Sequence, residues 1–122
     1  MERALARILV VDDDEEVLEV AVAVLANLGH AVTSAHSAAD ALRLLGEDPA
    51  IELLFTDVMM PGGVNGFELA RHARAMRPDL RVIYATGYAK VPEAGAGEIF
   101  GPVLEKPYRA AELAEAVEQR LG

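Results

Sequence analysis

The chain has 122 residues, of which 52% are hydrophobic and 25% are charged, and its formal net charge is −9. This length allows one domain with a single sizeable core, and the composition is that of a globular chain. The acidic balance argues against duplex DNA as a partner, because binding to the phosphate backbone needs basic groups that displace counterions. With no cysteine in the sequence, disulfides, thiol nucleophiles and thiolate metal sites are excluded.

Membrane insertion and secretion are also disfavoured by the sequence. No apolar run approaches the roughly 20 residues needed to cross a bilayer. The acidic Glu2 and the short apolar run before Asp12 make a poor signal peptide. We therefore expect a cytoplasmic protein with no membrane or nucleic-acid partner, in which residues 1–122 form a single domain with no output domain.

Strand and helix patterns alternate along the chain from residue 7 onward. Apolar, β-branched runs predict strands, while apolar stripes at helical spacing with capping residues predict helices. The segment at 20–24 also alternates like a strand, but its length and the following Gly29 favour a helix. The predicted strands are 7–11, 31–35, 51–55, 80–85 and 102–104, and the predicted helices are 14–28, 38–45, 65–76, 90–100 and 109–121.

Single residues set several of these boundaries. Ser37 and Asn65 are predicted to cap the second and third helices, and Gly46 is predicted to end the second. The helix at 90–100 is the weakest, because it contains Pro92 and two glycines that each cost roughly 1 kcal/mol relative to alanine.

Regular alternation of five strands with five helices predicts an α/β fold in which a parallel sheet is covered on both faces. Right-handed crossovers make a doubly wound, flavodoxin-like (βα)5 sheet the simplest arrangement. We expect the strand order 2-1-3-4-5. In such sheets the chemistry collects beyond the carboxyl ends of the strands.

Polar side chains follow four of the predicted strands. Asp12 and Asp13 follow the first strand, Asp57 the third, Thr86 the fourth and Lys106 the fifth. Mg²⁺ prefers oxygen ligands and needs only one or two carboxylates when a phosphate is present. A carboxylate can also attack phosphorus to give an aspartyl phosphate, and a cation then holds the charged phosphoryl oxygens. The sequence therefore predicts an acidic Mg²⁺ site suited to phosphoryl transfer.

The order and spacing of these residues resemble the receiver domain of bacterial two-component response regulators. The resemblance runs from about Arg7 to the last helix, and each motif lies at a predicted strand end. The motifs are Asp12-Asp13 after Ile-Leu-Val-Val, Asp57-Val58-Met59-Met60-Pro61, Thr86-Gly87 and Lys106-Pro107.

The resemblance implies a phosphoacceptor and a metal site. Asp57 would take a phosphoryl group from a histidine kinase, a phosphotransfer protein or a small-molecule donor. Asp13 and Asp57 would bind Mg²⁺ directly, the Met59 backbone carbonyl would complete the protein ligands, and Asp12 would act through water. Such a protein is a regulator that catalyses only its own phosphorylation and dephosphorylation.

The resemblance also implies the response to phosphorylation. Lys106 would pair with the phosphoryl oxygens, and the Thr86 hydroxyl would move toward them. The Lys106–Pro107 bond would be cis. A downstream protein target would bind the face formed by residues 90–121.

The sequence departs from the common family pattern in two places. The loop at 62–66 is one residue longer than usual, a variant similar to receivers of hybrid sensor kinases and compatible with a stand-alone receiver. The position three before Lys106, often aromatic in the family, is Val103. Tyr88 or Tyr108 could take over the role of that aromatic.

The same residues allow other interpretations. The acids at 12–14 could simply cap the first helix. Asp12 and Asp14 also resemble the nucleophile and acid of haloacid-dehalogenase-type phosphatases, although the downstream acidic pair of that family is missing. A receiver-like module that is never phosphorylated is a third possibility. The three histidines (His30, His36 and His72) lack metal-ligand spacing and are expected at the surface or in loops.

Overall fold

The computed structural model describes residues 5–60, 65–87 and 99–121. Within these ranges the chain forms a five-stranded parallel sheet of order β2-β1-β3-β4-β5 and four helices. The strands are β1 (Arg7–Val11), β2 (Ala31–Ala35), β3 (Ile51–Asp57), β4 (Arg81–Thr86) and β5 (Val103–Glu105). The helices are α1 (Glu15–Asn27), α2 (Ala38–Glu47), α3 (Gly66–Met76) and α4 (Ala110–Leu121). The predicted flavodoxin-like fold and strand order are confirmed.

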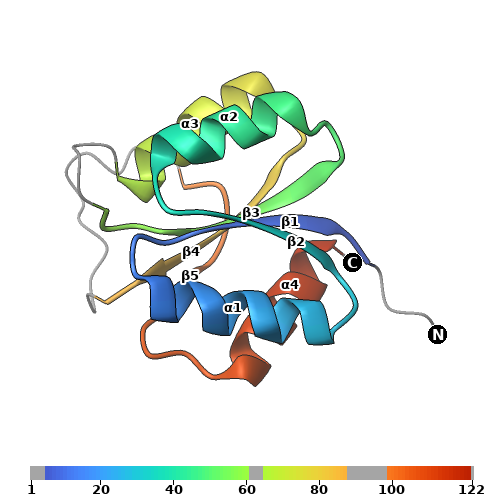
Figure 1. Cartoon of the computed structure of the whole chain (residues 1–122), viewed down its shortest axis with the longest axis vertical. Helices are drawn as coiled ribbons and strands as arrows, with labels where there is room; N and C mark the ends of the chain where they lie inside the picture. Colours follow the sequence, from blue (N-terminus) through green and yellow to red (C-terminus); the bar gives the residue numbers. More distant parts are fainter. Residues whose placement is uncertain (1–4, 61–64, 88–98, 122) are drawn as a thin grey trace.

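Two helical layers sandwich the sheet, with α2 and α3 on one face and α1 and α4 on the other (Figure 1). The central strands β1 and β3 are apolar on both faces, as expected for a covered parallel sheet. The core facing α1 and α4 includes Ile8, Val10, Leu53, Phe55 and Ile83, and the core facing α2 and α3 includes Leu9, Val11 and Leu54. No helix in the described ranges is long and apolar enough to cross a membrane.

The first three helices begin at capping side chains, and the two that were predicted as caps, Ser37 and Asn65, are confirmed. The Asp14 carboxylate caps α1, the Ser37 hydroxyl accepts the Asp40 N–H at 3.2 Å, and the Asn65 side chain accepts the Glu68 N–H at 2.9 Å. Gly29 follows α1 with a φ of 98°, a conformation that favours glycine and ends the helix there.

The predicted end of the second helix at Gly46 is wrong. Helix α2 continues through Gly46 to Glu47, and Asp48 is its C-cap. An Arg43–Glu47 pair at 3.2 Å spans this last turn and supports it. Glycine weakens a helix without ending it when neighbouring contacts hold the turn.

Arg77, the C-cap of α3, also contacts this end of α2. Its guanidinium donates hydrogen bonds to the carbonyls of Leu45, Asp48 and Ile51. These carbonyls belong to the end of α2 and the start of β3, so Arg77 satisfies helix-terminal acceptors that have no partner within the helix. One side chain therefore joins α2, β3 and α3 at the edge of the sheet opposite the carboxyl ends of the strands.

His30 lies in the loop between α1 and β2, within the expectation of a surface or loop position, but it is not at the surface. It is buried, and its Nδ1 accepts the backbone N–H of Ala6 at 3.1 Å. The turn at Gly29 brings His30 to the start of β2, beside the residue that precedes β1. The side chain thus satisfies a buried backbone donor, whereas His36 and His72 are exposed as expected.

Three sequence-based predictions fall wholly or partly outside the described residues. Of the predicted helix at 90–100, only the last two residues are among the described ones. Most of the loop that begins at Pro61 and the side chain of Tyr88 also lie outside them.

We predict that Arg77→Met lowers the free energy of unfolding by about 2–3 kcal/mol, because it removes three partly buried hydrogen bonds from a charged donor to backbone carbonyls. Urea denaturation followed by circular dichroism measures the change. Arg109→Met is the matched control, since the Arg109 side chain is 88% exposed and should change stability by less than about 0.5 kcal/mol. Equal effects of the two substitutions would contradict the assigned role of Arg77.

Candidate functional site

Three carboxylates meet at the carboxyl ends of β1 and β3, which are adjacent strands. Asp57 is the last residue of β3, and Asp12 and Asp13 directly follow β1. One carboxylate oxygen from each of the three lies within 4.8 Å of the others. Asp12 and Asp57 are 5% and 6% exposed, whereas Asp13 is exposed. The predicted acidic cluster is therefore formed, with one member open to solvent.

Lys106 reaches this cluster from the end of β5, on the far side of β4. Its Nζ donates to Asp12 Oδ2 at 2.9 Å and lies 3.2 Å from Asp57 Oδ1. Its backbone N–H donates to the Thr86 carbonyl at 2.8 Å, which anchors the residue to β4. The Lys106–Pro107 bond is cis, as predicted. Lys106 therefore bridges the two buried carboxylates.

The charges of the cluster shift the ionisation of its members. Burial raises the pKa of Asp57; Lys106 opposes this shift, and Asp12 adds to it. Burial acts to lower the pKa of Lys106, but the hydrogen bond to Asp12 and the charge of Asp57 outweigh it, so the Lys106 pKa is raised. The site thus holds a firmly charged cation beside an acid whose ionised form is disfavoured.

The acids at 12–14 divide between two tasks. Asp14 accepts the N–H groups of Glu16 and Val17 at 3.0 and 3.3 Å, so it is the N-cap of α1. Asp12 accepts the Asp14 N–H at 2.9 Å and binds Lys106 through its other oxygen. The capping interpretation holds for Asp14 alone.

Thr86 and Met59 lie beside the cluster. Thr86 is the last residue of β4 and is buried, and its neighbour Ala85 is the register partner of Asp57. Met59 is two residues beyond Asp57 and is 48% exposed. All six residues of the predicted site are therefore collected at one edge of the sheet.

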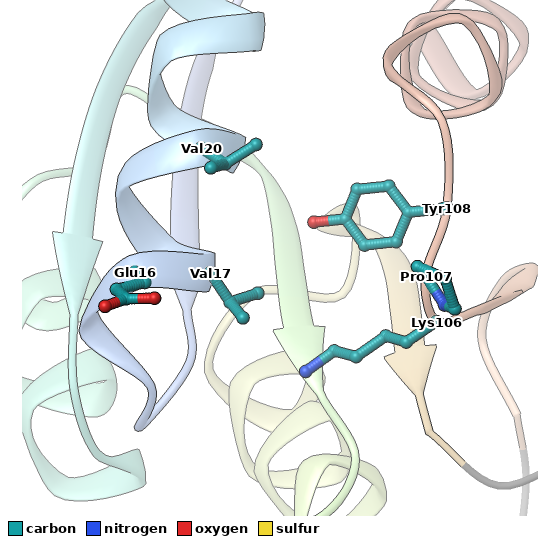
Figure 2. A pocket seen from close by; sticks show the side chains of 6 residues that line it. All are labelled: Glu16, Val17, Val20, Lys106, Pro107 and Tyr108. Carbon is teal, nitrogen blue, oxygen red and sulfur yellow. The ribbon is translucent and has the colours of Figure 1, made fainter.

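A groove of about 450 Å³ adjoins the site between α1 and the segment joining β5 to α4. It is lined by Glu16, Val17, Val20, Lys106, Pro107 and Tyr108. Figure 2 shows the Tyr108 hydroxyl directed toward α1 and the Lys106 chain passing below it. The Tyr108 ring packs edge-on against Phe55, with ring centroids 5.7 Å apart, and burial raises its pKa. Tyr108 therefore belongs to the layer of α1 and α4.

A cluster around Phe100 was not predicted from the sequence. The Tyr84 hydroxyl accepts the Phe100 N–H at 3.2 Å, and the fully buried Tyr84 ring packs on Phe67 at 4.9 Å. The Arg74 guanidinium lies 4.8 Å from the centre of the Phe100 ring, and Arg120 donates to the Phe100 carbonyl at 3.0 Å. These contacts join β4, α3 and α4.

Val103 packs against this same apolar cluster. The position that is often aromatic in the family is therefore filled by an aliphatic side chain, and Tyr84 supplies the buried aromatic ring. No local pattern indicates this, because Tyr84 lies in an apolar strand run where any large apolar residue would fit.

Comparison with known proteins identifies the class. The family model of the response regulator receiver domain matches residues 8–118, so the chain belongs to this family. Receiver domains are the phosphoacceptors of two-component signalling, and they bind Mg²⁺ at an acidic cluster of the kind that Asp12, Asp13 and Asp57 form.

Individual relatives agree. The chain is 36% identical to the response regulator receiver protein CpdR of Brucella abortus, and the match covers 94% of this chain and 96% of CpdR. It is also 36% identical to the DNA-binding transcriptional regulator NtrC of Azospirillum brasilense, but spans only 24% of that protein. The crystal structure of a receiver protein from Sinorhizobium medicae superposes with a TM-score of 0.87 at 32% identity, covering 96% and 94% of the two chains.

The raised pKa of Asp57 predicts a pH-dependent stability. The folded protein holds the Asp57 proton more tightly than the unfolded chain, so ionisation costs stability as the pH rises from the ordinary value of 3.8 through the raised pKa. Asp57→Asn should therefore raise the free energy of unfolding at pH 7 by on the order of 0.5–2 kcal/mol, and the gain should shrink as the pH falls toward 4.

Urea unfolding between pH 4.5 and 8 in EDTA measures this gain. The exposed Asp79→Asn is the control and should change stability by less than about 0.5 kcal/mol. A loss of stability in Asp57→Asn at pH 7 would show that the attraction of Lys106, rather than burial, dominates at Asp57.

Proposed function

We propose that Asp57 accepts the phosphoryl group and that Asp12, Asp13, Met59, Thr86 and Lys106 assist the transfer. The observation that carries this proposal is the Lys106 ammonium group lying between the buried carboxylates of Asp12 and Asp57. A cation that is already fixed there can stabilise the negative charge of an incoming phosphoryl group, because it does not have to be recruited from solvent. The domain formed by residues 1–122 would then act as a phosphorylated switch.

In the reaction, an Asp57 carboxylate oxygen attacks the phosphorus of the donor and forms a new P–O bond. With a phosphohistidine donor the P–N bond breaks and the imidazole leaves with its electron pair, to be protonated by water. With acetyl phosphate the P–O bond breaks and acetate leaves. The products are the Asp57 acyl phosphate and the free donor.

The acids provide a site for Mg²⁺. Asp13 and Asp57 would bind the ion directly together with the Met59 carbonyl, and Asp12 would act through water. The oxygen donors and their spacing fit a hard divalent cation. When bound, the ion neutralises charge on the phosphoryl oxygens. A structurally similar response regulator, TrrA of Thermotoga maritima, was solved in complex with Mg²⁺–BeF, with a TM-score of 0.85 at 28% identity.

Phosphorylation then changes the partners of two residues. Lys106 would exchange part of its contact with the Asp57 carboxylate for the phosphoryl oxygens, and the Thr86 hydroxyl would turn toward them. Because the Thr86 carbonyl is bonded to the Lys106 N–H, both residues move within one connected unit of β4 and β5. This biases a two-state equilibrium of the domain.

A histidine kinase or phosphotransfer protein would supply the phosphoryl group, and a downstream protein would bind the face at residues 90–121. In the described part of that face, Phe100 links β4 and α4 through Tyr84 and Arg120. These contacts give the strand that carries Thr86 a direct connection to the helix that a partner would touch. Chemistry is limited to formation and hydrolysis of the protein's own acyl phosphate.

The proposal predicts one added phosphoryl group on the wild type after incubation with Mg²⁺ and acetyl phosphate, measured by intact mass. Asp57→Ala should show no adduct, and Asp14→Asn, which alters only the α1 cap, should retain it. Rapid hydrolysis of the donor that depends on Asp12 and persists in Asp57→Ala would instead indicate a phosphatase. No adduct and no turnover would indicate an interaction module that is not phosphorylated.

Lys106 should affect the rate of transfer. We predict that Lys106→Met slows adduct formation by about 10²-fold or more, because it removes a fixed donor from the developing charge. Arg109→Met is the control and should match the wild type. Adding EDTA to the wild type should abolish the adduct, since the acids alone repel the anionic donor. A Lys106→Met rate within twofold of the wild type would exclude this role for Lys106.

A further inference from the structure

The peptide group that follows the phosphoacceptor is held from both of its ends. Thr56, the residue before Asp57, is fully buried, and its hydroxyl donates to the Asp57 carbonyl at 2.9 Å. The other end of the same peptide is the Val58 N–H, which donates to the Ala85 carbonyl at 2.8 Å. The Asp57–Val58 peptide is thus fixed between a side chain of β3 and the backbone of β4.

Gly66 packs closely against the same peptide. A Cβ atom added to Gly66 would lie 2.2 Å from the Asp57 carbonyl oxygen and 2.9 Å from the Val58 Cα. Any side chain at this position would therefore displace the backbone of the phosphoacceptor. The Gly66 N–H also donates to the Val58 carbonyl at 2.8 Å, so the first residue of α3 holds the next peptide as well.

We propose that Thr56 is a positioning residue for phosphoryl transfer: its hydroxyl, with Gly66, sets the backbone of Asp57 and thereby the direction of the carboxylate. This inference rests on the proposed function of Asp57. Orientation of the Asp57–Val58 peptide fixes ψ of Asp57, and the same stretch of backbone leads to the Met59 carbonyl. One hydroxyl therefore acts on two of the groups that would face the metal and the phosphoryl group.

The geometry favours positioning over simple filling of space. Thr56 is fully buried in β3, with Val11 of β1 and Tyr84 of β4 as its register partners, and valine would occupy nearly the same volume there without a polar atom. The Thr56 hydroxyl donates to the carbonyl of the residue whose carboxylate would attack the phosphorus. Small displacements of reacting groups are costly, because transfer requires the attacking oxygen and the phosphorus to be in line.

The test compares Thr56→Val and Thr56→Ser for the rate of phosphorylation by acetyl phosphate at saturating Mg²⁺. Thr56→Val should lower the maximal rate constant by about 3- to 10-fold, corresponding to the loss of one hydrogen bond, while the half-saturating donor concentration changes by less than about twofold. Thr56→Ser keeps the hydroxyl and should return the rate to within about twofold of the wild type.

Controls separate positioning from folding. Thr33→Val makes the same change in β2, away from the site, and should leave the rate unchanged. Circular dichroism and urea unfolding establish that each variant is folded. A folded Thr56→Val with the wild-type rate would overturn the inference, as would a Thr56→Ser rate no better than that of Thr56→Val.

Gly66→Ala gives an independent measurement, because its Cβ displaces the Asp57 carbonyl without removing a hydrogen-bond donor. It should slow phosphorylation at least as much as Thr56→Val, and a folded Gly66→Ala with the wild-type rate would contradict the inference. If Gly66→Ala does not fold, the comparison of Thr56→Val with Thr56→Ser alone tests the inference. Failure of the wild type to form the Asp57 adduct would instead refute the proposed function itself.

Discussion

The site depends on one ion-pair arrangement, in which the Lys106 ammonium group lies between the carboxylates of Asp12 and Asp57. Two acids buried at adjacent strand ends repel each other and lose hydration, and the raised pKa of Asp57 records that cost. Lys106 offsets it from the end of β5, more than 90 residues from Asp12. This cation is placed near the acids by the strand order, which puts β5 beside β4, and by the hydrogen bond from the Lys106 N–H to the Thr86 carbonyl. Lys106 directly follows the short β5.

The sequence predicted what depends on local pattern. Apolar runs ending in Asp12, Asp57 and Thr86 marked the strand ends, and the alternation of strands and helices implied that these ends share an edge. What it missed depends on distant partners. Gly46 remains helical where Arg77 reaches the end of α2 from the end of α3, and His30 is buried because Ala6 lies across from it. Such contacts leave no periodic signal.

The Phe100 cluster belongs to this second group, and it changes how the departure at Val103 is understood. The family often has an aromatic residue at that position, and two other tyrosines were considered as replacements. Tyr108 packs against Phe55 in the layer of α1 and α4, whereas Tyr84 lies on the opposite face beside Val103. Two arginines, from α3 and α4, complete the cluster through the Phe100 ring and carbonyl. A large side chain at Val103 is unnecessary where Tyr84 already fills the layer.

The hydrogen bond from the Gly66 N–H to the Val58 carbonyl has a consequence for the evolution of the chain. It joins the two ends of the segment 59–65 directly beside Asp57. The entropy cost of a closed loop grows only slowly with its length, so residues can be added within it without altering the backbone at Asp57. The sequence predicts one such addition, the extra residue at 62–66. A lineage can therefore vary the length of this segment while the backbone at Asp57 stays constant.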